Sequence, residues 1–190
     1  MRRLVPQLDD ITVDEQLRLY VPWEQAREDR PFVAMNFVAT VDGRATIEGR
    51  SGPIGSEADT AMLVGLRERF DAVMIGHGTK RVEGYEKLAK PLVVVESGPD
   101  GPADLAVLLR EQREQGVRAL LCEGGPRLHA SLQELGLVDE LFLTIAPRLA
   151  GAGAPGILEG ELPGVAELEL VWLLEEDGEL FARYRVRPAR

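Results

Sequence analysis

Cysteine and histidine are nearly absent from this chain of 190 residues, which has one cysteine, Cys122, and two histidines, His77 and His129. A single cysteine cannot form an internal disulfide, and two histidines beside it do not complete a closed zinc site. The sequence therefore excludes a disulfide framework, and we expect no metal centre.

Positive charge and long apolar stretches are also scarce. The 22 Lys and Arg residues are outnumbered by 32 Asp and Glu residues, and the resulting net charge of −10 opposes general binding to nucleic acid. Apolar stretches such as residues 92–95 and 141–145 are far shorter than the roughly 20 residues of a membrane span. Pro6, Asp9 and Asp10 stand where a signal peptide needs apolar residues. We therefore expect a cytoplasmic protein without a membrane partner.

What the chain does have is a globular composition, with 45% hydrophobic and 28% charged residues. Residues 1–30 are more polar than the rest and contain several prolines, so they are interpreted as a lead-in with one short helix around Leu17. Residues 31–190 are predicted to form a single domain, since that length suffices to bury a core.

Strand and helix patterns alternate from residue 32 onward, which is typical of a mostly parallel α/β sheet with helices on both faces. Ser56 and Asp59 resemble a capping box ahead of one helix. Asp177-Gly178 predicts a tight antiparallel hairpin near the C-terminus. The expected strands are residues 32–41, 72–75, 92–95, 118–122, 138–145, 167–174 and 179–186, and the expected helices are 56–69, 103–115 and 126–135.

Ligands of such sheets bind beyond the carboxyl ends of the strands, so the loops at residues 40–46, 76–79, 95–98 and 123–128 are the candidates. In the last loop, Gly124 and Gly125 allow close backbone approach to a phosphate, and Pro126 suits the first turn of a helix whose free N–H groups attract anions. A pyrophosphate would fit there. The alternative is that Gly-Gly-Pro serves only the geometry of a tight turn. The GHGT turn at residues 76–79 is weaker, because it lacks the third glycine of the dinucleotide fingerprint.

Three sequence blocks carry a family resemblance: ATVDGRAT, LRERFDAVMIGHGT and EGGPRLHASLQELGLVDELFLTIAPRLAG, which together span roughly residues 32–151. In type and order they resemble the reductase domain of the riboflavin pathway, a member of the dihydrofolate-reductase-like group. The resemblance implies a three-layer α/β fold and an enzyme that transfers hydride from NADPH to C1′ of a ribosylamino-pyrimidine, giving a ribityl product. It also implies a homodimer, for which the apolar segment 137–147 and the lead-in are candidate surfaces.

The resemblance also implies roles for individual residues. For the small-molecule substrate these are Asn36, Asp42, Ser51 and Arg67, of which Asp42 and Asn36 would be catalytic. For the cofactor they are Ala39, Thr79, Glu83, Ser97, Glu123, Gly124, Gly125 and Pro126.

Several of these residues have a plainer interpretation. Arg67 offers a planar fork of donors suited to a phosphate, but it is also typical of a solvated helix residue paired with Glu68 or Asp71. Asp42 precedes Gly43 and is often simply a turn former. A pyrophosphate would repel the Glu123 carboxylate, so we expect Glu123 to hydrogen-bond ribose hydroxyls or loop amides.

Few positively charged residues of the sequence support a preference for NADPH over NADH. Recognition of a 2′-phosphate usually needs Arg or Lys, whereas Ser97 is preceded by Glu96. Lys80 and Arg81 in the neighbouring loop are expected to compensate.

Three further residues are less informative. His77 lies inside the GHGT turn and is the histidine better placed to touch a ligand. We interpret His129 as structural and Cys122 as a small buried strand residue.

The segment KRVEGYEKL at residues 80–88 departs from the family pattern, with Glu83 in place of an Asp and no proline. Two alternatives therefore stay open. The first is a reductase of the same fold acting on a pterin or another carbonyl compound. The second is a non-catalytic nucleotide-binding protein that has lost the substrate loop.

Overall fold

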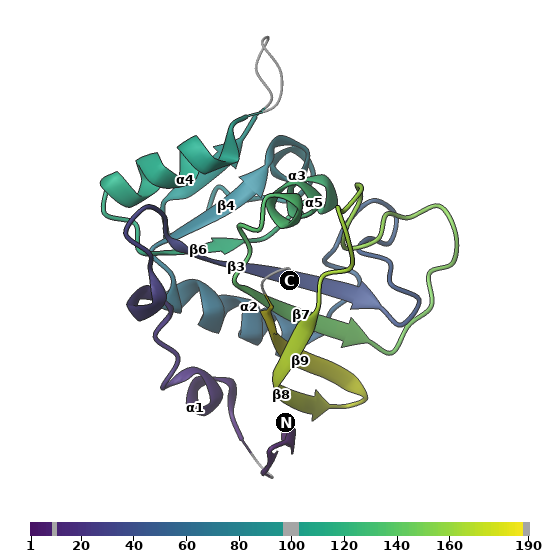
Figure 1. Cartoon of the computed structure of the whole chain (residues 1–190). Helices are drawn as coiled ribbons and strands as arrows, with labels where there is room; N and C mark the ends of the chain where they lie inside the picture. The colour runs from purple at the N-terminus through teal and green to yellow at the C-terminus, as the bar shows by residue number, and fades with distance from the viewer. Residues whose placement is uncertain (9–10, 97–102, 188–190) are drawn as a thin grey trace.

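The computed structural model describes residues 1–8, 11–96 and 103–187 of the chain (Figure 1). Within these ranges nine strands form one sheet, in the order β2-β1-β8-β9-β7-β3-β6-β4-β5. The strands are β1 (Arg2–Val5), β2 (Gln7–Leu8), β3 (Phe32–Thr40), β4 (Ala72–Gly76), β5 (Leu92–Val95), β6 (Ala119–Cys122), β7 (Glu140–Ala146), β8 (Leu168–Glu176) and β9 (Glu179–Val186). The helices are α1 (Val13–Leu17), the 3-10 helix η1 (Pro22–Gln25), α2 (Glu57–Arg69), α3 (His77–Val82), α4 (Leu105–Glu114) and α5 (Pro126–Glu134).

Strand β3 lies in the middle of the parallel part of the sheet. It runs parallel to β6 on one side and to β7 on the other. Its residues alternate between the faces: Phe32 and Ala34 belong to one core cluster, and Val33 and Met35 to the other. Both faces of the strand are therefore buried, which explains why its sequence is a nearly continuous apolar run.

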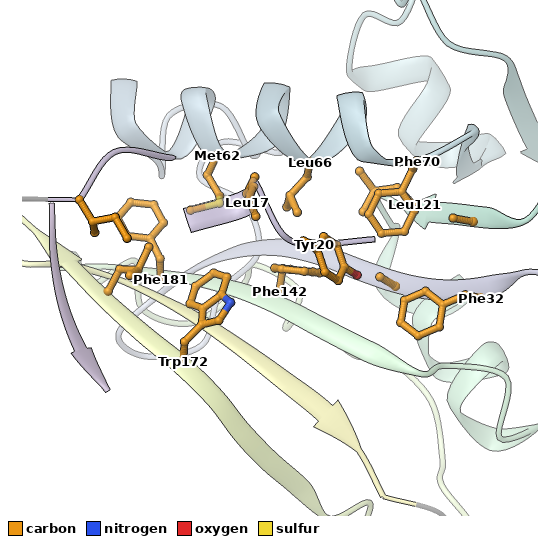
Figure 2. Packing of buried hydrophobic residues seen from close by; sticks show 14 residues of the cluster. Leu17, Tyr20, Phe32, Met62, Leu66, Phe70, Leu121, Phe142, Trp172 and Phe181 are labelled. Atoms are coloured by element: carbon orange, nitrogen blue, oxygen red, sulfur yellow. The ribbon is translucent and has the colours of Figure 1, made fainter. Parts of the chain in front are cut away.

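Helices cover the two faces of the sheet as separate layers (Figure 1). On one face, Met62 and Leu66 of α2, and Phe70 directly after it, point toward aromatic side chains of the sheet, including Phe142 and Phe181 (Figure 2). Leucines of α4 and α5 pack on the other face, namely Leu105, Leu109, Leu128 and Leu132. The predicted three-layer α/β fold is confirmed.

The C-terminal hairpin also has the predicted form. Asp177 and Gly178 have φ angles of 50° and 82°, the positive values that a two-residue type I′ turn requires between β8 and β9. Strand β9 then pairs antiparallel with β7. This pairing joins the antiparallel end of the sheet to the parallel strands β7-β3-β6-β4-β5.

The N-terminal residues contribute to the same sheet. Strand β1 pairs antiparallel with β8 and with β2, an arrangement that the sequence pattern did not predict. The expected short helix is α1, whose N-cap Thr12 forms a reciprocal capping box with Glu15. Leu17 and Tyr20 pack in the same core cluster as α2.

One expectation is corrected and another is narrowed. Residues 77–79 do not form a glycine-rich turn, because α3 begins at His77 directly after β4. The apolar segment 137–147 is also not a free strand edge that a second subunit could extend. Its strand β7 is paired on both edges, with β3 and β9, and most of its side chains are buried within the chain.

In the part of the chain that the structure describes, no helix is both long and apolar enough to cross a membrane.

Candidate functional site

A cavity of about 810 Å³ opens beyond the carboxyl ends of the parallel strands. Its walls come from β3, from the segments that follow β4 and β6, and from the first turns of α2, α3 and α5. This is the edge of the sheet at which the sequence places the ligand loops. Lining residues that matter below are Asn36, Ser51, Asp59, Thr79, Glu83, Tyr85, Glu123, Gly125, Pro126 and Arg127.

The bend at Gly124 and Gly125 is held against the end of β4. The Gly76 amide donates to the Gly124 carbonyl at 2.8 Å, and the Glu123 amide donates to the Met74 carbonyl at 2.9 Å. Gly124 has a φ of 102°, a backbone conformation that disfavours a side chain. A Cβ atom at Gly125 would lie 3.0 Å from Thr79 Oγ1. Gly125 lines the cavity, whereas Gly124 is buried behind it, so the backbone of this bend faces the cavity at Gly125.

Helix α5 begins at this bend without a side-chain cap. Its N-cap is Gly125, which has no side chain, and Pro126 occupies the first turn. The first N–H groups of a helix carry partial positive charge and attract anions when nothing caps them. Since Gly125, Pro126 and Arg127 line the cavity, the residues present fit the diphosphate of a dinucleotide.

Glu123 is held by two side chains that are distant in sequence. Arg67 donates from Nε to Glu123 Oε1 at 2.7 Å and from Nη2 to Oε2 at 2.6 Å, and the Tyr85 hydroxyl donates to Oε2 at 3.0 Å. The plainer alternative for Arg67, a pairing with Glu68 or Asp71, is therefore not what the structure shows. The same bonds contradict the expectation that Glu123 bonds to loop amides.

The Arg67 guanidinium does not line the cavity, and its forked donors are already engaged by a carboxylate whose side chain is 5% exposed. The hydrogen bonds that Arg67 donates to Glu123 raise the pKa of Arg67, and burial raises the pKa of the Tyr85 hydroxyl. The geometry thus makes Arg67 a residue that positions Glu123, and it offers no phosphate contact.

Ser51 and Glu83, both named from the resemblance, are brought together. The Glu83 carboxylate accepts hydrogen bonds from the Ser51 amide at 2.7 Å and from the Ser51 hydroxyl at 2.9 Å. Both residues line the cavity, and this contact ties the loop after β3 to the end of α3. Glu83, which stands where the family pattern has an Asp, therefore still places a carboxylate-bearing residue in the cavity wall.

Asp42 is not among the described residues that line the cavity. Its carboxylate accepts hydrogen bonds from Thr40 Oγ1 at 2.5 Å and from the amides of Ala150 and Gly151 at 3.1 and 2.8 Å. The bond from Thr40, followed by those from the amides, lowers the pKa of Asp42 to about 2. A carboxylate that is ionised at neutral pH and lies outside the cavity has no proton to deliver, so the geometry favours the turn-forming role.

Of the remaining predicted site residues, some line the cavity and others do not. Asn36 and Thr79 line the cavity, whereas Ala39 is buried and does not. Ser97 lies outside the described residues. Lys80 and Arg81 are exposed in the last turn of α3 and do not line the cavity, so the compensation expected from them is not seen.

His129 and Cys122 have the structural roles expected of them, and His77 lies where a ligand could be contacted. His129 is buried, stacks on Phe37 with ring centroids 5.1 Å apart, and donates from Nδ1 to the Ile157 carbonyl at 2.8 Å. Burial lowers its pKa, so His129 is a neutral structural residue. His77 lines the cavity and lies 3.3 Å from Glu96. Cys122 is fully buried, and burial raises its pKa to about 12.

Three lining residues were not anticipated as site residues. Tyr85 belongs to the segment 80–88 whose sequence departs from the family pattern. Arg127 is the one arginine or lysine among the described residues of the wall. Asp59 was expected to cap a helix, and its spacing from Ser56 gave no signal of a place in the cavity.

The fold and the position of the cavity define the class. Dihydrofolate reductase from Enterococcus faecalis has the same fold, with a TM-score of 0.59 at 15% identity over 83% of this chain and 97% of that one. A pyrimidine reductase-like protein from Corynebacterium diphtheriae superposes with a TM-score of 0.77 at 20% identity, covering 94% of this chain and all of that one. The chain is thus a dihydrofolate-reductase-like α/β protein.

The family is narrower than the fold. The model of the RibD C-terminal domain matches residues 31–95 and 80–177, and the chain belongs to this family. A relative from Methanothermobacter thermautotrophicus named 2,5-diamino-6-ribosylamino-4(3H)-pyrimidinone 5′-phosphate reductase is 27% identical over 73% of this chain and 88% of its own length. The riboflavin biosynthesis protein RibD of Escherichia coli is 41% identical over 36% of this chain, a match that spans only 18% of that protein.

Proposed function

We propose that this protein is an NADPH-dependent reductase that reduces C1′ of a ribosylaminopyrimidine 5′-phosphate in riboflavin biosynthesis. The observation that carries the proposal is the uncapped start of α5 at the Gly124-Gly125 bend, which opens on the cavity. The names of the archaeal relatives, which match along 88% of their length, support the choice of substrate.

The cofactor side of the cavity is assigned to the elements after β4 and β6. The backbone at Gly124 and Gly125 and the first amides of α5 would bind the diphosphate, and Thr79 would contact the adjoining part of the molecule. Arg127 at the rim adds a positive charge. When bound, NADPH supplies the hydride.

The substrate side is assigned to β3, α2 and the loop that contains Ser51. Asn36 lies on the wall and offers both a donor and an acceptor to the pyrimidine or to the ribose. Arg67 and Tyr85 hold the Glu123 carboxylate between the two sides, where it can accept a hydrogen bond from a ribose hydroxyl. Holding the two reactants in one geometry is the main catalytic contribution that these residues make.

The test is an absorbance assay of NADPH consumption with the deaminated and undeaminated ribosylaminopyrimidine phosphates side by side, and with the corresponding ribosides lacking phosphate. We expect turnover with one of the phosphates. Oxidation with a pterin alone would favour a different reductase, and cofactor binding without any turnover would favour a non-catalytic protein.

A parallel fluorescence titration compares NADPH with NADH. The proposal predicts tighter binding of NADPH. Equal affinities would contradict the cofactor preference without affecting the reduction itself, since the hydride chemistry of the two cofactors is the same.

A further inference from the structure

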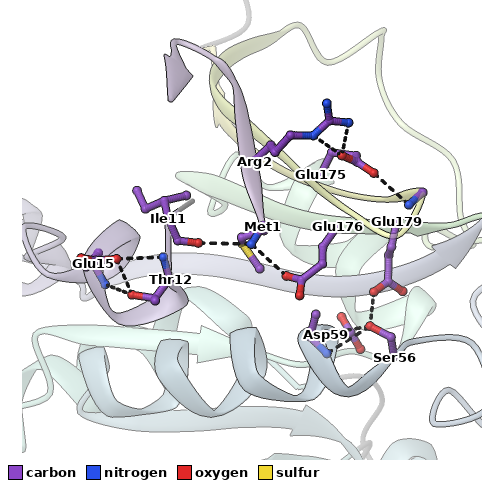
Figure 3. A network of polar contacts seen from close by, with 12 residues as sticks. Met1, Arg2, Ile11, Thr12, Glu15, Ser56, Asp59, Glu175, Glu176 and Glu179 are labelled. Atoms are coloured by element: carbon purple, nitrogen blue, oxygen red, sulfur yellow. Dashed lines mark hydrogen bonds and ion pairs between the residues drawn. The ribbon is translucent and has the colours of Figure 1, made fainter. Parts of the chain in front are cut away.

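Asp59 lies in the first turn of α2 but does not complete the expected capping box. Ser56 Oγ accepts hydrogen bonds from the amides of Ala58 at 3.1 Å and Asp59 at 3.3 Å, and it donates to Glu179 (Figure 3). Among the bonds of the described residues, none runs from the Asp59 carboxylate back to the Ser56 amide. The side chain is therefore not used to start the helix.

Asp59 instead lines the cavity. It is hydrogen-bonded to the Thr144 side chain of β7. Thr144 pairs in register with Val38 of β3, and both Val38 and Asn36, two residues earlier on the same face, line the cavity. Asp59 thus lines the same cavity as the catalytic candidate Asn36, on the side assigned to the substrate.

Gly55 leaves the room that the Asp59 carboxylate occupies. A Cβ atom on Gly55 would lie 2.2 Å from Asp59 Oδ2, so glycine at this position allows the carboxylate to occupy its place. A side chain at residue 55 would push the Asp59 carboxylate away from the wall.

The surroundings of Asp59 favour its protonated form. Burial raises its pKa to about 6, and the negative charge of Glu179 on β9 acts in the same direction, while the bond with Thr144 on β7 opposes it. Glu179 is itself buried, and its short hydrogen bond is with Ser56 of Asp59's own helix. The carboxylates of Glu123 and Glu83, by contrast, accept hydrogen bonds from Arg67 and Ser51, respectively.

We propose that Asp59 is the proton donor of the reduction. The inference rests on the proposed function, which requires one proton for each hydride. The hydride forms the new C1′–H bond, and the C1′–O4′ bond breaks with its electron pair going to O4′. The Asp59 proton then completes the 4′-hydroxyl. The nicotinamide is oxidised, C1′ is reduced, and solvent returns the proton to Asp59.

The test compares Asp59→Asn with Glu57→Gln, which removes the same charge from an exposed position two residues earlier in the same helix turn. Asparagine keeps the size of the side chain but cannot act as an acid. We expect kcat to fall by about 10²-fold or more in Asp59→Asn, since general acid catalysis contributes on the order of 10²–10⁴-fold. Glu57→Gln should change kcat by less than about threefold. Circular dichroism and NADPH affinity verify that both variants are folded.

The pH profile separates an acid from a residue that only binds. With Asp59 as the donor, kcat/KM of the unmodified enzyme falls about tenfold per pH unit above its pKa, and this limb is absent from the residual activity of Asp59→Asn. Carbon-13 NMR of the carboxyl groups should show one aspartate titrating near pH 6 that disappears in Asp59→Asn.

The possible outcomes test the role of Asp59 and the proposed function separately. A rise in KM with kcat and the pH limb unchanged would assign Asp59 to binding and overturn the inference. A flat pH profile of the unmodified enzyme between pH 5 and 8 would overturn it even if the variant does not fold. Absence of turnover by the unmodified enzyme with every ribosylaminopyrimidine would overturn the proposed function, and the role of Asp59 with it.

Discussion

At the scale of single residues, the Gly125 position tests the phosphate site directly. A Cβ at Gly125 would lie 3.0 Å from Thr79 Oγ1 and would occupy the exposed backbone of the bend. We expect Gly125→Ala to weaken NADPH binding by at least about tenfold, which corresponds to about 1.4 kcal/mol.

Fluorescence titration measures this change. The matched control is Gly164→Ala, since a Cβ at that position has no neighbour within 4 Å. Equal NADPH affinity in Gly125→Ala and Gly164→Ala would show that the bend does not hold the cofactor.

The pair of Arg67 and Glu123 is the second residue-scale prediction. Removal of Arg67 leaves a carboxylate that is 5% exposed with only the Tyr85 hydroxyl as a side-chain donor. We expect Arg67→Met to lower the free energy of unfolding by about 2–3 kcal/mol, somewhat less than for a fully buried pair because Arg67 retains some solvent contact.

A double-mutant cycle with Glu123→Gln isolates the interaction. The double variant should be more stable than the sum of the single losses implies, by about 1 kcal/mol or more in urea unfolding. Additive losses would show that the two residues stabilise the fold independently.

Asp59 makes a separate prediction about stability. Its pKa is raised from 3.8 to about 6 in the folded protein, so between these values the folded state binds more protons than the unfolded state. The free energy of unfolding therefore falls as pH rises from about 4 to 6, by at most about 3 kcal/mol. Asp59→Asn should lack this loss and be more stable than the unmodified protein at pH 7.

Urea unfolding at pH 4, 5, 6 and 7 provides the comparison. Glu57→Gln, which alters an exposed carboxylate of the same helix, should follow the unmodified protein. Parallel stability curves for Asp59→Asn and the unmodified protein would contradict the raised pKa.

At the scale of secondary-structure elements, the start of α2 is stabilised by more than a cap. Ser56 Oγ accepts from two amides of the first turn and donates to Glu179, whose side chain is buried. Ser56→Ala should therefore cost about 2–3 kcal/mol, the loss of a cap together with a buried carboxylate left without its donor.

The N-cap of α4 is the matched comparison. Asp104 accepts from the amides of Ala106 and Val107, both at 3.1 Å, in an exposed setting. Asp104→Ala should cost only about 1 kcal/mol. Equal losses in thermal or urea unfolding would mean that the bond with Glu179 contributes nothing.

At the scale of the whole molecule, the family resemblance predicts a homodimer. Strand β7 offers no free edge for it, because β3 and β9 occupy both of its edges. Sedimentation at micromolar concentration should give twice the mass of one chain, and a monomeric mass would contradict the prediction.

Much of this architecture was predictable because it depends on local pattern. A strand buried on both faces must be apolar along its length, and the type I′ turn needs residues that tolerate positive φ, as Asp177 and Gly178 do. The loops of the site were likewise predictable, since parallel strands end at one edge of the sheet. The N-terminal strand β1 escaped prediction, because four polar and apolar residues have no distinctive period.

The sequence by itself therefore determined the layers, the hairpin and the Gly-Gly-Pro start of α5. Only the tertiary structure decided which carboxylates take part in the site. Arg67 and Glu123 are 56 residues apart, and Asp42 is tied to a loop 108 residues further along the chain. The burial that raises the pKa of Asp59 arises only when β7 and β9 pack beneath α2. Charge and burial at a site depend on such distant neighbours, whereas helix and strand patterns depend on near ones.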